Sequence, residues 1–410
     1  MTLISFGDIN KNSVHILIAG IGKVLAELVY KLDDDFQRHP FIIGIASALG
    51  MCLSIIPFIF VKIYSKKSKE QKELLIISTN EKVKKKKRRQ ICLKYLLIFA
   101  SAFFDFTQKL LSFFFVQDVK DNYWIVNMLC LSIFSYFILK SKLYIHQRLS
   151  LFIMIILGLI LNIIINLQVK YNKRIVDKLY QISLSFIIEL FFSLPFVINK
   201  YAMEYCYALS FEITFYQGLF GFIAFSILLI ISTNMEIKNE KYKDFINIEY
   251  NGKKYIDNLF DYTDKIDFKK LIAFIVMMIT RLCFNLFSNI TVQYFTPSHV
   301  ALILLIGEFI FSFKKIDWIF FGEIIIMVIS LFMLLIYTEI IELHFCRLDF
   351  YTKKNIAKRA GRITVMSDDS YDIGGGILIE ESNENTDKDN DEVSQEKKEN
   401  QEIILSSINE

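Results

Sequence analysis

The sequence contains apolar runs that are too long for the core of a soluble domain. Residues 151–167, LFIMIILGLILNIIINL, carry no charged side chain, and a helix needs roughly 20 apolar residues to cross a bilayer. Hydrophobic residues make up 54% of the 410 positions, and the mean hydropathy is +0.40. A transmembrane β-barrel needs short segments of alternating polarity, which these unbroken runs lack. We therefore predict an all-α polytopic membrane protein.

The long apolar segments predict about ten transmembrane helices. The first and third segments carry charges and the ninth is short, so these three have the weakest signals. The ten segments are 14–30, 41–63, 95–116, 122–139, 148–168, 182–199, 208–232, 270–294, 298–313 and 316–341.

The ten predicted helices divide naturally into two halves of five. An odd number of helices in each half forces the halves into opposite orientations, the plan of many secondary transporters. Polar residues support this division, because Asp105 and Arg281 are 176 positions apart, and so are Ser112 and Ser288. We predict a first repeat over 1–171 with a basic loop at 64–94, and a second repeat over 172–342 with a charged loop at 233–269. Residues 343–410, first basic and then acidic, have the composition of a disordered tail.

Basic residues predict how the chain is oriented. The segment Lys62–Lys94 contains thirteen Lys or Arg and three Glu, including the block Lys84–Arg89. By the positive-inside rule this loop is cytosolic, and an even number of helices then places both termini in the cytosol. The same block could bind anionic lipid headgroups. Lys170, Lys173, Arg174 and Lys178 oppose this orientation.

Motifs for soluble chemistry are missing from the sequence. The six cysteines form no CxxC pair, the five histidines form no HExxH, and there is no GxSxG or phosphate-binding GxxxxGK[ST]. We therefore predict no enzyme activity, no cofactor and no metal site. The net charge of +4 is too small to indicate a nucleic-acid partner.

Two segments resemble a known family. The charged corner and long apolar helix in FILKSKLYIHQRLSLFIMIILGLIL resemble the end of the first repeat in the drug/metabolite transporter superfamily. Residues 193–222, SLPFVINKYAMEYCYALSFEITFYQGLFGF, are similar to the sixth and seventh helices of the F-type branch of solute carrier family 35, an EamA-like family. The resemblance implies ten helices in two inverted repeats, cytosolic termini and an endomembrane location, Golgi or lysosome/vacuole. It names no substrate, since members carry nucleotide sugars and other organic solutes.

Charged side chains at membrane depth are the candidate substrate contacts, because they are costly unless they face a partner or water. Arg281 is our first candidate, since a guanidinium can hold a carboxylate or phosphate with two hydrogen bonds. An ion pair with Asp105, Glu189 or Glu308 is the alternative. Asp105 and Lys109 lie one turn apart, and they either pair or line a cavity.

Five further positions complete the predicted site. Lys23 could pair with Glu27 on its own helix, and Glu189 stands alone in an apolar helix, where it could take up a proton. Asn285 could line a cavity, although for isolated amides such as Asn289 a role in helix packing is favoured. Tyr216 and Gln217 lie beside Gly218 and Gly221, and we expect those glycines to allow close helix packing rather than to contact substrate.

These features predict a secondary active transporter that moves a small polar or anionic metabolite by alternating access. The predicted partners are this substrate and membrane lipids, and a homodimer is left open. The alternative is a membrane scaffold or receptor that does not transport and acts through its cytosolic tail. Because the candidate site contains both cations and anions, it is compatible with zwitterions, nucleotide-linked anions or protonated amines.

Overall fold

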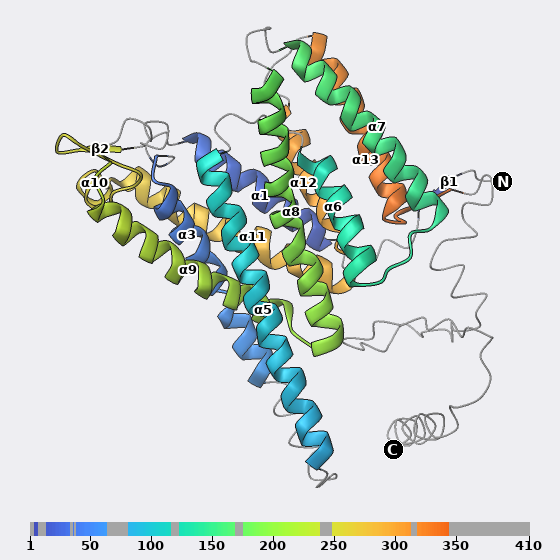
Figure 1. Ribbon diagram of the computed structural model, residues 1–410, viewed down its shortest axis with the longest axis horizontal. Coiled ribbons are helices and arrows are strands. Elements are labelled where there is room, and N and C mark those ends of the chain that lie inside the picture. Colours follow the sequence, from blue (N-terminus) through green and yellow to red (C-terminus); the bar gives the residue numbers. More distant parts are fainter. Residues whose placement is uncertain are drawn as a thin grey trace. The chain divides into compact units, whose positions relative to one another are not determined.

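In the computed structural model, the chain is mostly helical (Figure 1). The structure describes residues 4–6, 14–32, 36, 38–63, 81–115, 123–168, 175–237, 248–312 and 318–343. The predicted tail beyond Leu343 lies outside the described residues.

The described helices follow the apolar segments along the chain. They are α1 (Val14–Leu32), α3 (Pro40–Cys52), α5 (Glu81–Phe115), α6 (Tyr123–Ile138), α7 (Ile145–Gln168), α8 (Ile175–Cys206), α9 (Ser210–Asn234), α10 (Leu259–Asp264), α11 (Phe268–Tyr294), α12 (His299–Ser312) and α13 (Trp318–Tyr337). Two short antiparallel sheets accompany them, β1 (Ile4–Phe6) with β4 (Ile341–Leu343), and β2 (Ile248–Tyr250) with β3 (Lys253–Tyr255).

A helix occupies each of the ten predicted apolar segments. Among the described residues, five helical segments are long and apolar enough to cross a membrane: Pro40–Ile63, Arg88–Phe114, Phe186–Cys206, Ser210–Asn234 and Phe268–Tyr294. The stretches Val14–Ala26, Ile125–Ile138, Ile145–Ile160 and Ile324–Tyr337 are apolar but shorter. The prediction of an all-α protein with several membrane-type helices is confirmed at this level.

Helix α11 lies at the centre of the packing. It contacts α1, α3, α8, α9 and α12. Helix α8 packs against α5 and α6, α3 packs against α9, and α5 also contacts α9. Helices α7 and α13 run side by side (Figure 1). The structure thus joins helices from the two ends of the sequence rather than keeping each half apart.

The short ninth segment forms one of the most enclosed helices. Val300, Ala301 and Ile303 of α12 are fully buried, and Leu302 and Leu305 are nearly so. Apolar residues all round a helix are expected where the helix is surrounded by protein. The weak sequence signal at 298–313 therefore reflects a short helix, not an absent one.

Three glycines set the closest helix contacts. A Cβ atom at Gly50 of α3 would collide with the Met278 carbonyl of α11, and one at Gly218 of α9 would lie 2.7 Å from the Cys52 backbone nitrogen. A Cβ at Gly22 of α1 would lie 2.8 Å from the Phe284 nitrogen. Backbones can approach this closely only where a side chain is missing. The prediction that Gly218 serves helix packing is confirmed.

Helix α5 begins earlier than the apolar pattern indicates. It starts at Glu81, so residues 81–94 are helical, although the sequence analysis assigned them to the basic loop. Its 35 residues span about 52 Å at 1.5 Å per residue, well beyond a hydrocarbon core of about 30 Å. The block Lys84–Arg89 therefore lies on a helical extension, which apolar periodicity cannot detect because it contains almost no apolar residue.

The connection between α9 and α11 also folds, in part, where a charged loop was predicted. Its described residues form the β2–β3 hairpin, which turns at Asn251 and Gly252 in the left-handed region, and the helix α10. Asn258 caps α10 by accepting from the backbone N–H groups of Phe260 and Asp261. The Tyr250 hydroxyl donates to Asp264 at 2.6 Å, and this bond raises the pKa of Tyr250.

Asp257 fastens this folded connection to the start of α3. One carboxylate oxygen accepts from the Phe41 backbone nitrogen at 2.8 Å, and the other lies 2.8 Å from His39 Nδ1. The Asp257 backbone exchanges two hydrogen bonds with the Ser232 hydroxyl at the end of α9. Asp257 is fully buried, so these contacts replace the water that its carboxylate would otherwise hold. One residue therefore joins α3, through its side chain, to α9, through its backbone, just before α10 begins.

The glycine contacts predict a sharp difference between substitutions. Gly50→Ala should lower the stability of the purified protein by about 1–3 kcal/mol, because the new methyl group overlaps a backbone carbonyl that cannot rotate away. Thermal unfolding in detergent, followed by size-exclusion fluorescence, would measure the loss. Gly221→Ala is the matched control, since its Cβ would meet Ala48 at 3.4 Å. Equal unfolding temperatures for the two variants would contradict this packing.

A second prediction concerns the folded connection. Asp257→Ala should release it from α3, because the change leaves the Phe41 N–H and the His39 ring without their buried partner. Hydrogen–deuterium exchange should rise by at least tenfold in residues 248–264 and stay unchanged in α12. Asp264→Ala, which removes only the exposed bond to Tyr250, is the control. Unchanged protection in Asp257→Ala would refute the anchoring role.

Candidate functional site

A stripe of polar side chains runs along one face of α5. Lys94, Ser101, Asp105, Lys109 and Ser112 follow one another at spacings of seven, four, four and three residues, which keep them on one side of a helix. From Lys94 to Lys109 the stripe rises about 22 Å at 1.5 Å per residue. The stripe predicted from Asp105 to Ser112 therefore extends through most of the apolar part of α5.

Four uncharged side chains form a closed hydrogen-bonded ring at the middle of this stripe. Ser101 of α5 donates to Asn199 of α8 at 2.6 Å, and Asn199 donates to Asn289 of α11 at 2.8 Å. Asn289 donates to Gln217 of α9 at 3.3 Å, and Gln217 donates back to Ser101 at 2.8 Å. We call these four residues the amide ring. All four are buried, so the ring ties four helices together inside the apolar interior.

Asn289 is the most heavily bonded member of the amide ring. Besides Asn199 and Gln217 it contacts Thr214, whose hydroxyl accepts from Asn289 Nδ2 at 2.9 Å. Thr214 in turn donates to the Ser210 carbonyl on its own helix. The prediction that Asn289 bonds helices together is confirmed. Gln217, predicted to contact substrate, is here a partner in the same helix-joining network.

Asp105 and Lys109 form an ion pair one turn from the amide ring. Lys109 Nζ lies 2.6 Å from Asp105 Oδ2 and 3.9 Å from the Met51 sulfur of α3. Their side chains are 18% and 14% exposed, so the pair is neither sealed in the core nor open to the surface. Gln108 donates to Ser112 beside it. Of the predicted site residues, these two are brought into direct contact.

A second ion pair lies at the other end of the stripe. Lys94 Nζ of α5 lies 2.5 Å from Glu212 Oε2 of α9, and Glu212 is buried. Tyr216, one turn after Glu212, packs edge-on against Tyr95, with ring centroids 5.7 Å apart. The sequence analysis named Tyr216 but missed Lys94, because Lys94 lies where the basic segment meets the apolar helix and was assigned to the loop.

Arg281 lies on α11 with an intermediate exposure. Its backbone carbonyl accepts from the Asn285 side chain at 2.9 Å, so Asn285 bonds to its own helix. Of the acidic residues proposed as partners for Arg281, Asp105 pairs with Lys109, and the side chain of Glu308 lies outside the described residues. Ser288, next along the same stripe, is fully buried.

Glu189 and Lys23 lie in other parts of the helix packing. Glu189 of α8 is buried, and its backbone carbonyl accepts from Ser193, whose hydroxyl also accepts from Asn127 of α6. Lys23 of α1 reaches the Leu304 carbonyl of α12 at 3.5 Å and passes over Gly307. The side chain of Glu27, the partner proposed for Lys23, lies outside the described residues.

The polar side chains therefore fall into two classes. Uncharged amides and hydroxyls join helices, while the charged residues form pairs at two levels of α5. Each pair contains one cation and one anion. Either side chain could therefore release its partner and bind a solute group of the same charge as that partner. Within the described part of the chain, no three His, Cys, Asp or Glu side chains are grouped to hold a metal ion.

Comparison with protein-family profiles and with curated protein sequences finds no match for this chain. The site is therefore interpreted from its own chemistry.

The amide ring predicts which asparagine of α11 matters for stability. Asn289→Leu should cost about 1–3 kcal/mol, because it leaves Asn199, Gln217 and Thr214 with unsatisfied groups in the interior. Asn285→Leu, four residues earlier, is the matched control, since the Asn285 side chain donates to the Arg281 carbonyl of its own helix and can be replaced without leaving another side chain unsatisfied. Thermal unfolding in detergent would compare them. A greater loss for Asn285→Leu would contradict the ring.

Proposed function

We propose that this protein is a secondary active transporter that moves a small polar or anionic metabolite by alternating access. The observation that carries the proposal is the stripe of charged and amide side chains along α5. Ionised groups at membrane depth are costly, and they are typical of substrate and ion pathways. Here two ion pairs and an amide ring follow one helix face within an otherwise apolar protein.

The packing of the helices supports two structurally equivalent repeats, which five helices each would place in opposite orientations. If α1, α3, α5, α6 and α7 correspond in order to α8, α9, α11, α12 and α13, exchanging the two sets turns each major contact into another. The contact of α1 with α11 becomes that of α8 with α5, and α1 with α12 becomes α8 with α6. The contact of α3 with α11 becomes that of α9 with α5, while α3 with α9 and α7 with α13 exchange with themselves.

Positions along the chain agree with the same correspondence. Helices α6 and α12 begin at Tyr123 and His299, 176 residues apart, and α7 and α13 begin 173 residues apart. An offset of 176 also relates Asp105 to Arg281, and Lys94 to Lys270. Inverted repeats permit two states in which the halves exchange conformations, one state open to each side of the membrane. This exchange is the basis of alternating access.

The β1–β4 pairing supports an even number of membrane crossings. Ile4 lies opposite Leu343, and Phe6 lies opposite Ile341. Strands that pair must lie on one side of the membrane, so the chain between them crosses an even number of times, as ten helices would. The basic segments assign that side to the cytosol. The endomembrane location rests on the resemblance to solute carrier family 35.

The ion pair Asp105–Lys109 suggests how a solute could bind. Its partial exposure lets either charge exchange its neighbour for a substrate group, so Lys109 would hold an anion and Asp105 a cation. Arg281, equivalent to Asp105 in the other repeat, would supply the second cation for an anionic substrate. This reading favours a zwitterion or an organic anion. Glu189 is a candidate for proton coupling.

The alternative is a membrane scaffold that acts through its tail. In that case the buried charges have a structural role. The amide ring favours a structural role for Gln217 and Asn289, because their hydrogen bonds are explained without a substrate. The stripe of charges on α5 is not needed for a scaffold, so the transporter remains our first proposal.

The transport proposal predicts the effect of removing each charge. Full-length protein in liposomes loaded with pooled metabolites should exchange one class of external solute. Arg281→Ala and Lys109→Gln should each reduce that exchange by more than tenfold, because each deletes a cation for the substrate. Lys253→Gln, on the exposed β2–β3 hairpin, is the matched control and should keep the wild-type rate.

Three outcomes would separate the alternatives. Exchange lost in Lys109→Gln and restored by the charge swap Asp105→Lys with Lys109→Asp would indicate that the pair has only a structural role. If neither Arg281→Ala nor Lys109→Gln changed the exchange rate, the transport proposal would stand, but these two residues would not be substrate contacts. Folded protein that exchanges none of the pooled solutes would favour the scaffold.

A further inference from the structure

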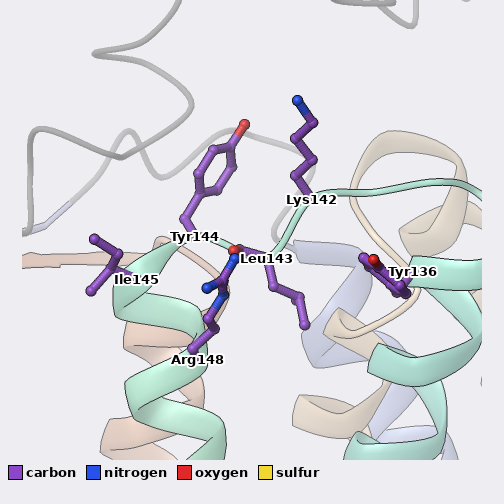
Figure 2. Close-up of a pocket in the computed structure, with 6 residues that line it drawn as sticks. All are labelled: Tyr136, Lys142, Leu143, Tyr144, Ile145 and Arg148. Atoms are coloured by element: carbon purple, nitrogen blue, oxygen red, sulfur yellow. The ribbon is translucent and has the colours of Figure 1, made fainter.

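A cationic cavity lies at the corner between α6 and α7, away from the stripe on α5. It is an open cavity of about 610 Å³, lined by Tyr136, Lys142, Leu143, Tyr144, Ile145 and Arg148. Figure 2 shows Lys142 and Tyr144 extending to the same side of the connection, while Leu143 points the other way. The lining residues that the structure describes include two cations and two phenol groups, and none of them is a carboxylate. Its chemistry therefore fits an anion.

The corner is built from well-defined backbone contacts. Helix α6 ends with Lys140 in the left-handed region, and the Ser141 N–H donates to the Ser135 carbonyl. The Gln147 side chain accepts from the Tyr144 N–H and donates to the Tyr337 carbonyl of α13. The cavity is thus held against the end of α13, which is followed along the chain by β4.

Arg148 is positioned at the rim of the cavity. Its Nε donates to the Leu143 carbonyl at 3.0 Å, which fixes the guanidinium beside the connection. Among the residues that the structure describes, Arg148 makes no ion pair. The remaining guanidinium nitrogens can still donate to phosphate oxygens, for which a guanidinium fork is well shaped.

The helix surfaces next to the cavity are apolar and exposed. On α7, Ile145, Leu149, Phe152 and Ile156 lie at helical spacing, and each is exposed. On α6, Phe137 is 72% exposed and Ile133 is also exposed. The two helices diverge to different partners, α6 to α8 and α7 to α13. An apolar stripe that ends in two cations matches a lipid, with acyl chains along the helix and a charged head at its end.

We propose that the α6–α7 corner is a binding site for an anionic phospholipid, whose phosphate-bearing head occupies the cavity between Lys142 and Arg148. The tyrosine hydroxyls donate to the headgroup, and the acyl chains lie along the exposed face of α7. Because the corner contacts the end of α13, the lipid belongs to the leaflet on the side of the β1–β4 sheet. The site is independent of transport and of the basic segment Lys84–Arg89.

Native mass spectrometry of the full-length protein in detergent tests this site. With equal amounts of phosphatidylserine and phosphatidylcholine added, the wild-type protein should retain phosphatidylserine preferentially. The double variant Lys142→Gln with Arg148→Gln should lower phosphatidylserine affinity by about tenfold or more, since it removes two charge-assisted contacts. Lys253→Gln with Lys254→Gln, which deletes two exposed cations on the β2–β3 hairpin, is the matched control and should bind as the wild type does.

Two further measurements distinguish a lipid from a soluble phosphate compound, and loss of charge from disruption of the fold. Glycerophosphoserine, which has the same head without acyl chains, should compete at least tenfold more weakly than the lipid, and equal competition would overturn the lipid assignment. Arg148→Lys should retain most of the affinity, and its loss would show that the corner's structure, not its charge, matters. Equal retention of phosphatidylserine and phosphatidylcholine, or equal effects of the two double variants, would also refute the site.

Discussion

The structure depends on satisfying polar groups inside an apolar environment. Hydrocarbon offers no hydrogen bonds, so each buried amide or hydroxyl must find its partner within the protein. The amide ring meets this demand with residues from α5, α8, α9 and α11. Because every bond in the ring joins two different helices, a shift of one helix breaks contacts with two others. The ring therefore fixes the register of all four helices at once.

Close packing supplies the second constraint. Between α3, α9 and α11 the glycines bring backbones into contact at Gly50 and Gly218, where dispersion forces act over many atom pairs. Among the described residues, most buried apolar side chains belong to two large clusters, one around α12 and the other around the start of α3. Polar bonds set the register and apolar packing fills the space, so neither alone would define this arrangement.

The sequence predicted the helices well but their partners poorly. Apolar runs mark helices because burial in lipid requires them, and even the short α12 was found this way. The helical start of α5 was missed because Lys84–Arg89 carry no apolar periodicity. The anchoring of Asp257 by His39 joins residues more than 200 positions apart, which no local pattern can indicate. Of the site, helix spacing allowed the Asp105–Lys109 pair as one of two interpretations, whereas the Lys94–Glu212 pair and the amide ring required the fold.

The contacts between the helices indicate which helices would move together in the proposed transport cycle. Helices α3, α9 and α11 meet at backbone-to-backbone contacts, and Asp257 fastens the start of α3 to the end of α9, so these helices must move together. Helix α5 meets its neighbours through side chains: the amide ring, the Lys94–Glu212 pair and aromatic edges such as Phe99 on Phe220. Side chains can exchange partners without displacing a backbone, and hydrogen bonds between membrane helices contribute only about 1 kcal/mol each. If the proposed transport occurs, we therefore expect α5 to shift against a rigid α3–α9–α11 unit, and such a shift would require Ser101 to exchange its partners in the amide ring.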